Sequence, residues 1–152
     1  MQDAEAKCTD LMRRHQGDSL IQKIGCKILY ALAARPDNDI PIVAEGGIEV
    51  TIAAMRKYQR DAAIQNNGVG VLASLAAKLE NLIPIAAEGG IEVAIAALRE
   101  HPCDCSIQKT GCALLHNLAA IPENKVRIVA EGGIEVMRIC ILTQCDPTKV
   151  GQ

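Results

Sequence analysis

The chain has 152 residues, of which 49% are hydrophobic and 22% charged, and its formal net charge is -2. This composition excludes a disordered or fibrous protein, and no apolar run approaches the roughly 18 residues that a membrane-spanning helix needs. The small net charge gives no attraction to nucleic acid, and two tyrosines are the only aromatic residues, so base-stacking platforms are excluded. We therefore expect one soluble domain that neither inserts into membranes nor binds nucleic acid.

The N-terminal segment has no basic patch followed by an apolar stretch, so the sequence shows no secretory signal. The whole chain has seven cysteines, an odd number, and it is large enough to have its own core. This favours reduced thiols over a disulfide framework. We expect an intracellular protein.

One short segment occurs three times, as VAEGGIEV at 43–50, AAEGGIEV at 86–93 and VAEGGIEV at 129–136. Its glutamates, Glu45, Glu88 and Glu131, stand 43 residues apart. The same period relates further sets of identical residues: Ile21, Ile64 and Ile107; Gln22, Gln65 and Gln108; Gly25, Gly68 and Gly111; Leu32, Leu75 and Leu118; Asn38, Asn81 and Asn124. A period of roughly 20 to 50 residues indicates a solenoid or propeller, whose units bury their apolar faces against their neighbours.

The apolar residues within 107–120 recur every three or four positions, and no part of the chain alternates with a period of two. In chain order, 3–35 supplies the second and third helices of one unit, 37–78 and 80–121 are complete three-helix units, and 123–144 supplies two helices of a last unit. Both ends are thus incomplete units, which favours either a fragment of a longer array or a module whose ends pack on something else.

Local signals divide each unit. The short first helix ends at a glycine pair because glycine can adopt the left-handed conformation that closes a helix. The second helix ends in a loop such as 101–105, where Asp104 or Ser106 caps the third helix. The third helix stops before Pro122, whose ring disfavours helical geometry in the preceding residue. The repeated asparagines precede the first helices, and we expect them to cap those helices: Asn38, Asn81 and Asn124.

A 43-residue unit of short, medium and long helices, with EGGI between the first two and GCALLHNLA in the third, resembles the armadillo repeat over nearly the whole chain. HEAT repeats are the alternative, but their two-helix units lack the Gly-Gly break. The resemblance implies a single right-handed α-solenoid domain whose third helices line a concave groove. It also implies that an asparagine late in each third helix binds the main chain of an extended peptide.

Carried over residue by residue, that asparagine matches only Asn117, because Ala31 and Ser74 occupy the same position in the other units. The tryptophan often found four residues earlier is also missing. Lysines at nearby positions predict a positively charged groove for an acidic or phosphorylated peptide, although lysines are also common on any solvated helix face. The candidate partner-binding residues are Lys23, Lys27, Tyr30, Asn66, Ser74, Lys109, Ala113, His116 and Asn117.

The sequence contains no nucleophile, phosphate-loop or metalloprotease motif. We therefore expect a protein-binding scaffold without catalysis or cofactor. One alternative is an assembly module that associates with copies of itself through its end faces. Another is a metal or redox sensor built on Cys103, Cys105, Cys112 and His116, although the CxC spacing is unusual for zinc and Cys112 aligns with Cys26 and Val69 in what is predicted to be a packing position.

Overall fold

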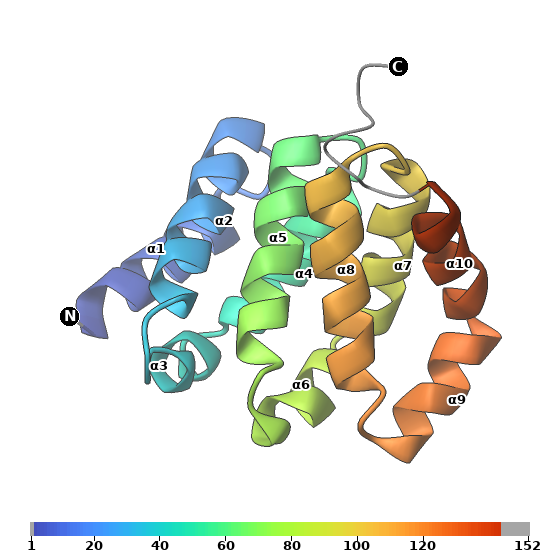
Figure 1. Cartoon of the computed structure of the whole chain (residues 1–152). Coiled ribbons are helices and arrows are strands. Elements are labelled where there is room, and N and C mark those ends of the chain that lie inside the picture. The colour runs from blue at the N-terminus through green and yellow to red at the C-terminus, as the bar shows by residue number, and fades with distance from the viewer. Residues whose placement is uncertain (1, 144–152) are drawn as a thin grey trace.

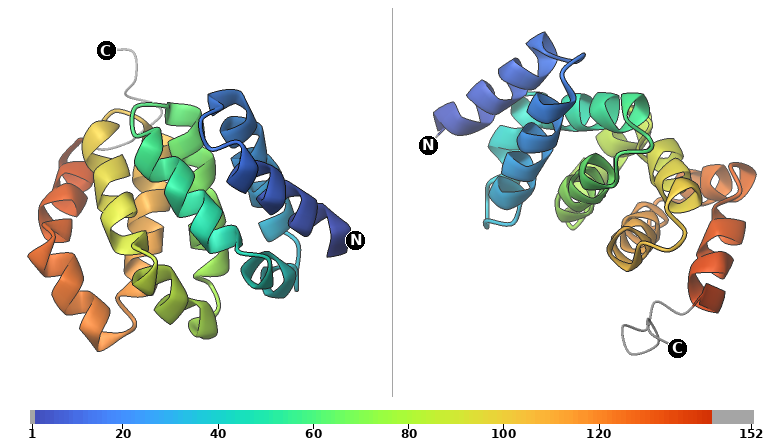
Figure 2. Two further views of the ribbon diagram at one scale, coloured as in Figure 1. Left: turned by 180° about the vertical axis from the view of Figure 1, so that it is seen from behind. Right: turned by 90° about the horizontal axis from the view of Figure 1, so that it is seen from above.

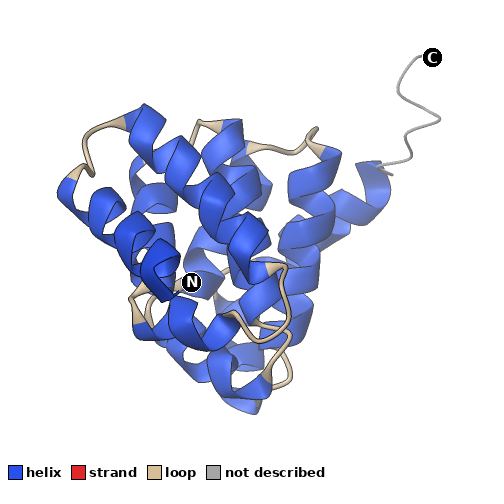
Figure 3. Ribbon diagram, turned by 90° about the vertical axis from the view of Figure 1, so that its left-hand side faces the viewer, coloured by secondary structure: helices blue, strands red, loops and turns tan. Residues whose placement is uncertain are grey.

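The computed structural model describes residues 2–143, and this range contains helices and loops but no strand (Figure 1, Figure 3). The prediction of an all-α fold is therefore confirmed. Gln144, which ends the predicted last unit, and Cys145 lie outside the described residues. The elements are α1 (Gln2–Arg14), α2 (Ser19–Ala33), α3 (Asp39–Ala44), α4 (Gly47–Lys57), α5 (Ala62–Leu75), the 3-10 turn η1 (Leu79–Asn81), α6 (Leu82–Ala87), α7 (Gly90–Glu100), α8 (Cys105–Leu118), α9 (Pro122–Ala130) and α10 (Gly133–Thr143).

The helices form three rows when they are followed at intervals of one repeat. Helices α2, α5 and α8 pack side by side, and α1, α4, α7 and α10 form a second row against them. The shorter helices α3, α6 and α9 lie along the lower edge in Figure 1. Seen from above, the second row curves around the first (Figure 2). The described residues therefore form a helical repeat-like all-α fold.

The core lies between the two long rows. Ile64 in α5 and Ile107 in α8 are fully buried. Gly68 allows the second helix to approach the third closely, because a Cβ atom at this position would lie 2.6 Å from the side chain of Met55. The equivalent pairs are Gly25 with Met12 and Gly111 with Leu98. This packing explains why a glycine recurs in the middle of each third helix.

Each short first helix ends at a glycine with a left-handed backbone, as the sequence predicts. The φ angle is 82° at Gly46, 101° at Gly89 and 85° at Gly132. The next glycine begins the second helix and packs closely on the first. A Cβ atom at Gly90 would lie 2.8 Å from the carbonyl oxygen of Ile85. The sharp corner therefore requires glycine at both positions, for conformation at the first and for space at the second.

An arginine near the end of the second helix in each of the first three units donates a hydrogen bond to the glycine corner of the next unit. The guanidinium Nη2 donates to a main-chain carbonyl, from Arg13 to Glu45 at 3.3 Å, from Arg56 to Glu88 at 3.0 Å and from Arg99 to Glu131 at 2.9 Å. Carbonyls at a helix C-terminus lack partners within the helix and carry partial negative charge, so an arginine is favourable there. Leu142 stands at the corresponding position of α10.

A buried glutamine in each third helix connects it to the second helix of the same unit. Gln65 is 1% exposed, and its Nε2 donates to the carbonyls of Met55 at 2.9 Å and Tyr58 at 3.0 Å. Gln22 and Gln108 make the same pair of bonds, to Met12 and His15 and to Leu98 and His101. These carbonyls lie at the end of the second helix, where intrahelical donors run out.

The predicted capping role of the repeated asparagines is wrong. Asn38 and Asn81 make no side-chain cap bond, and Asn124 lies inside α9. Each Nδ2 instead donates to a carbonyl near the end of the preceding third helix, from Asn38 to Leu32 at 3.1 Å, from Asn81 to Leu75 at 2.9 Å and from Asn124 to Leu118 at 2.9 Å. Each of these carbonyls also accepts a main-chain amide three residues on, and the asparagine supplies a second donor across the turn between units.

The third helices begin at aspartates. Asp104 Oδ1 accepts from the amide of Ile107 at 3.1 Å, which confirms one of the two caps expected in this loop. Asp18 and Asp61 cap α2 and α5 in the same way. Ser106, the other expected cap, instead donates to Asn66 of the neighbouring third helix.

Candidate functional site

The predicted partner-binding residues all lie on the three third helices. We call the surface that they form the α2–α5–α8 face. It comprises Lys23, Lys27, Tyr30 and Ala31 of α2, Asn66 and Ser74 of α5, and Lys109, Ala113, His116 and Asn117 of α8. The side-by-side packing of α2 on α5 and of α5 on α8 brings them onto neighbouring elements.

Two lysines of α2 differ in their surroundings. Lys27 is exposed, whereas Lys23 is partly exposed and its Nζ lies 3.4 Å from Asp61 Oδ2. Asp61 also caps α5, so Lys23 contributes to holding α2 against the start of α5. An ion pair of this exposure contributes little to stability, about 0–1 kcal/mol. Lys27 is therefore the lysine of α2 that makes no ion pair among the described residues.

Tyr30 contacts α5 at Gly70. This glycine stands four residues before Ser74, where the armadillo resemblance would place a tryptophan. A Cβ atom at Gly70 would lie 2.8 Å from the Tyr30 ring, so the ring packs directly on the α5 backbone. Tyr30 remains 38% exposed. The role of Gly70 was missed from the sequence, although a second glycine two residues after Gly68 inside a helix was a signal of close packing.

In the middle of the α2–α5–α8 face, Asn66 makes a contact within the fold. Asn66 Oδ1 accepts a hydrogen bond from Ser106 Oγ at 2.8 Å, which joins α5 to the first turn of α8. Ser74 is half-buried near the end of α5. The sequence grouped Asn66 with the lysines one repeat away, but the structure shows that it serves an inter-helix contact.

Helix α8 presents three exposed residues of the face and one that is partly exposed. Lys109 and Ala113 are exposed and Asn117 is partly exposed, at intervals of four residues along one stripe of the helix. His116 is exposed but lines a cleft of about 340 Å³ between α8 and the pair α9 and α10. Lys109 and Asn117 therefore share a stripe, whereas His116 faces the next unit.

The exposed charge on this face is positive. Lys27 and Lys109 have no acidic partner within ion-pair distance in the part of the chain that the structure describes. Asp61, at the start of α5, is paired with Lys23 and bonded to two main-chain amides. A protein with a net charge of -2 thus presents a locally basic surface on its third helices.

The cysteines and histidines that the structure describes are not gathered into a metal centre. No group of three or more His, Cys, Asp or Glu residues within 2–143 is arranged to hold a metal ion. Cys8 and Cys26 are buried, and burial raises the pKa of their thiols to about 11 and about 12. The reactive form of cysteine is the thiolate, so these two thiols are poor nucleophiles and poor redox centres.

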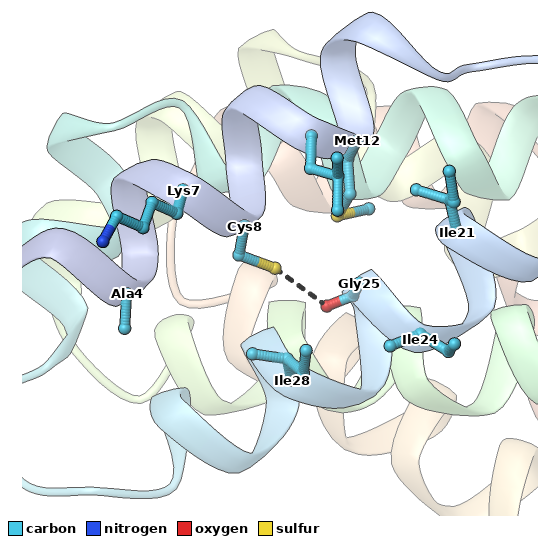
Figure 4. A pocket seen from close by; sticks show the side chains of 9 residues that line it. Ala4, Lys7, Cys8, Met12, Ile21, Ile24, Gly25 and Ile28 are labelled. Atoms are coloured by element: carbon cyan, nitrogen blue, oxygen red, sulfur yellow. Dashed lines mark hydrogen bonds between the residues drawn. The ribbon is translucent and has the colours of Figure 1, made fainter.

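A separate apolar cleft of about 360 Å³ lies between α1 and α2 (Figure 4). Cys8 forms its floor and donates a hydrogen bond to the Gly25 carbonyl, with Sγ 3.5 Å from the oxygen. Ile28 on its wall is 43% exposed, whereas the equivalent Val71 and Leu114 are completely buried by the preceding unit. We call this surface the α1–α2 end face. Its large exposed side chains are Leu11, Leu20, Ile24 and Ile28.

Within the described range, no single helix is long and apolar enough to cross a membrane. The pair Leu79–Ala87 and Gly90–Glu100, bent by 76°, reaches that length and composition only when both segments are taken together.

Comparison with protein families, with characterised proteins and with solved structures finds no match to this chain. The class that the described residues define is a helical repeat-like all-α protein with a basic face on its third helices. Its function is therefore inferred from its own geometry.

Proposed function

We propose that this protein is a non-enzymatic, intracellular armadillo-like solenoid that binds an extended acidic or phosphorylated peptide along the α2–α5–α8 face. The observation that carries the proposal is the pair of exposed lysines without acidic partners, Lys27 and Lys109, on third helices at either side of α5. Binding would need neither a cofactor nor a metal ion.

The solenoid arrangement is supported by bonds that recur with the repeat. The arginine-to-corner bond, the pair of glutamine-to-carbonyl bonds and the asparagine-to-carbonyl bond each occur three times among the described residues, once per unit or unit boundary. A structure in which every unit makes the same contacts with the next can be extended in one direction, and such arrays typically bind partners along their inner surface. The described cysteines form no disulfide with one another, which agrees with a reducing, intracellular environment.

The spacing of the face suggests what the peptide should contain. Packed helices stand about 8–10 Å apart, so α2 and α8 are separated by roughly 20 Å. An extended peptide advances about 3.3 Å per residue and would cover this distance in about six residues. Acidic or phosphorylated residues about six positions apart would therefore meet Lys27 and Lys109. The Asn117 amide could bond the peptide main chain, since it both donates and accepts.

We expect Lys109→Glu to weaken binding of such a peptide by about tenfold or more, because it replaces an attractive charge with a repulsive one. Asn117→Ala should weaken binding by about threefold to tenfold through the loss of a hydrogen bond. Peptide arrays and fluorescence anisotropy would measure both effects. The matched control is Lys57→Glu, which makes the same charge change on the exposed end of α4.

Acidic peptides that bind wild type, Lys109→Glu and Asn117→Ala equally well would contradict this proposal. A stronger effect of Lys57→Glu than of Lys109→Glu would place the binding surface elsewhere.

A second candidate function is self-association, and the α1–α2 end face favours it. Ile24 is 49% exposed, at a position where the interior units carry Asn67 and Thr110. Leu11 is likewise 49% exposed and replaces the buried Ala54 and Ala97. This end face is thus richer in large apolar side chains than the equivalent faces inside the array. Contiguous exposed apolar surfaces are typical of interaction sites.

If the end face mediates association, the solution mass of the protein should rise with concentration. The Ile24→Lys variant should keep the monomer mass at concentrations where the wild type associates. A buried lysine without a partner opposes the contact by several kcal/mol, so about a tenfold change in dissociation constant is a conservative expectation. Sedimentation equilibrium would measure it. A concentration-independent mass for the wild type would exclude association through this face.

A further inference from the structure

The edge formed by the first helices carries a row of exposed aliphatic side chains that repeats with the fold. Ile40 in α3, Ile83 in α6 and Val126 in α9 stand one repeat apart, and they are 66%, 66% and 71% exposed. Leu79, which is 70% exposed, lies beside this row at the start of the second complete unit. The three first helices lie next to one another along this edge in both opposite views (Figure 1, Figure 2).

Packing within the fold does not account for this row, because about two thirds of each side chain is exposed. Another solvent-facing position, occupied by Arg14, Lys57 and Glu100, changes the sign of its charge between units. The edge position keeps an aliphatic residue in all three units, although a polar residue would be compatible with the same exposure. We call Ile40, Ile83 and Val126 the aliphatic row.

A row of acidic residues accompanies the aliphatic row, three residues before it in each unit. It consists of Asp37, Glu80 and Glu123, all of which are exposed. Lys78 is engaged within the protein: it donates to Asp39 at 2.6 Å, which lowers the pKa of the Asp39 carboxyl, and its Nζ also lies 3.7 Å from Asp37 Oδ1. Asp37 is therefore partly neutralised, whereas Glu80 and Glu123 make no ion pair among the described residues.

Between α6 and α9 the edge is hollowed. A cleft of about 410 Å³ is lined by Ile83 and Ile121 with Glu123 beside them. Arg127, also in its lining, donates to the Ala86 carbonyl at 3.0 Å and pairs with Glu92. The hollow is therefore apolar, with a carboxylate at its side and its one cation bound within the protein.

We propose that the edge of α3, α6 and α9 is a second docking surface, and that it takes a basic amphipathic helix whose apolar residues lie on the aliphatic row and whose lysines or arginines face Glu80 and Glu123. The surface is chemically opposite to the basic α2–α5–α8 face. The protein can therefore bind two partners of opposite charge at the same time.

The geometry selects a helix as the partner segment. Equivalent residues of neighbouring units are separated by about the 8–10 Å between packed helices. An α-helix places the same face outward every seventh residue, a rise of about 10.5 Å. A helix with an apolar residue at every seventh position therefore matches all three members of the row, with a basic residue beside each one to meet the acidic row.

The test is fluorescence anisotropy of the whole chain with a synthetic helical peptide of three heptads, with leucine at every seventh position and lysines flanking it. Two comparison peptides replace lysine by glutamate or scramble the same composition. We expect the basic peptide to bind at least about tenfold more tightly than either one. Equal binding of the three peptides would overturn the proposal.

The variant Ile40→Ser, Ile83→Ser and Val126→Ser should lower the affinity of the basic peptide by about tenfold or more. Because the three side chains are mostly exposed, its melting temperature should remain close to that of the wild type. The matched control is Leu20→Ser, Ile141→Ser and Leu142→Ser, which removes three similarly exposed aliphatic residues, 61%, 74% and 69%, elsewhere. Equal losses in the edge variant and the control would show nonspecific apolar adhesion and contradict the proposal.

A charge variant, Glu80→Lys with Glu123→Lys, tests the acidic row without touching the aliphatic one. It should reverse the preference, so that the glutamate peptide binds more tightly than the lysine peptide. An unchanged preference would refute the role of the acidic row. Lys109→Glu should leave binding at the edge intact, which separates this surface from the α2–α5–α8 face.

Discussion

Replacing Gly90 with alanine is expected to destabilise the protein by about 2–4 kcal/mol, although alanine is the better helix former by about 1 kcal/mol. Gly90 is buried at the first position of α7, and an added Cβ atom would lie 2.8 Å from the Ile85 carbonyl oxygen. That oxygen belongs to the main chain and cannot move without opening the corner between α6 and α7. Thermal and denaturant unfolding would measure the loss.

Gly17→Ala provides the control for this change. Gly17 lies in the exposed loop between α1 and α2, and its added Cβ atom would meet only the end of Lys57, at 3.9 Å. The same chemical substitution should therefore change stability by less than about 1 kcal/mol. A Gly90→Ala protein as stable as Gly17→Ala would show that the corner is not sterically limited.

Gln65→Leu is expected to cost about 1–3 kcal/mol, even though leucine has a similar size and is more hydrophobic. The substitution removes the Nε2 donor that serves the Met55 and Tyr58 carbonyls; the Tyr58 carbonyl keeps its bond from the Asp61 amide, so the main loss is at the Met55 carbonyl. The free energy of unfolding in urea would report the change. Because α4 is bonded to α5 through this side chain, we also expect faster amide exchange at the end of α4.

The control for Gln65→Leu is Gln59→Leu, in the exposed loop that follows α4. Only the main-chain carbonyl of Gln59 is used, by His101 Nε2 at 2.8 Å, so a new side chain leaves that contact intact. Stability should stay within about 0.5 kcal/mol of the wild type. Similar losses in the two variants would mean that the paired carbonyls are not the cause.

Much of the candidate site could be located from the sequence, because the repeat places equivalent residues on equivalent helices. The positions of Lys27, Lys109 and Asn117 on the third helices follow from helical spacing and the period alone. Whether these side chains are free of contacts within the fold does not follow from the spacing. Lys23 and Asn66 have the same spacing as Lys109, yet one pairs with Asp61 and the other accepts a bond from Ser106. Both partners lie about one repeat away, and sequence spacing gives no information on which neighbour a side chain meets.

The sequence by itself determined the helical elements, the period and the glycine corners. These depend on local requirements, such as the left-handed backbone at Gly89 or the Asp104 cap, that act within a few residues. Only the tertiary structure decided that Asn81 bonds backward to Leu75, that Tyr30 packs on Gly70 and that Ile83 stays exposed. Those outcomes depend on which unpaired carbonyl or apolar face a neighbouring helix covers, and that is settled only when the units pack together.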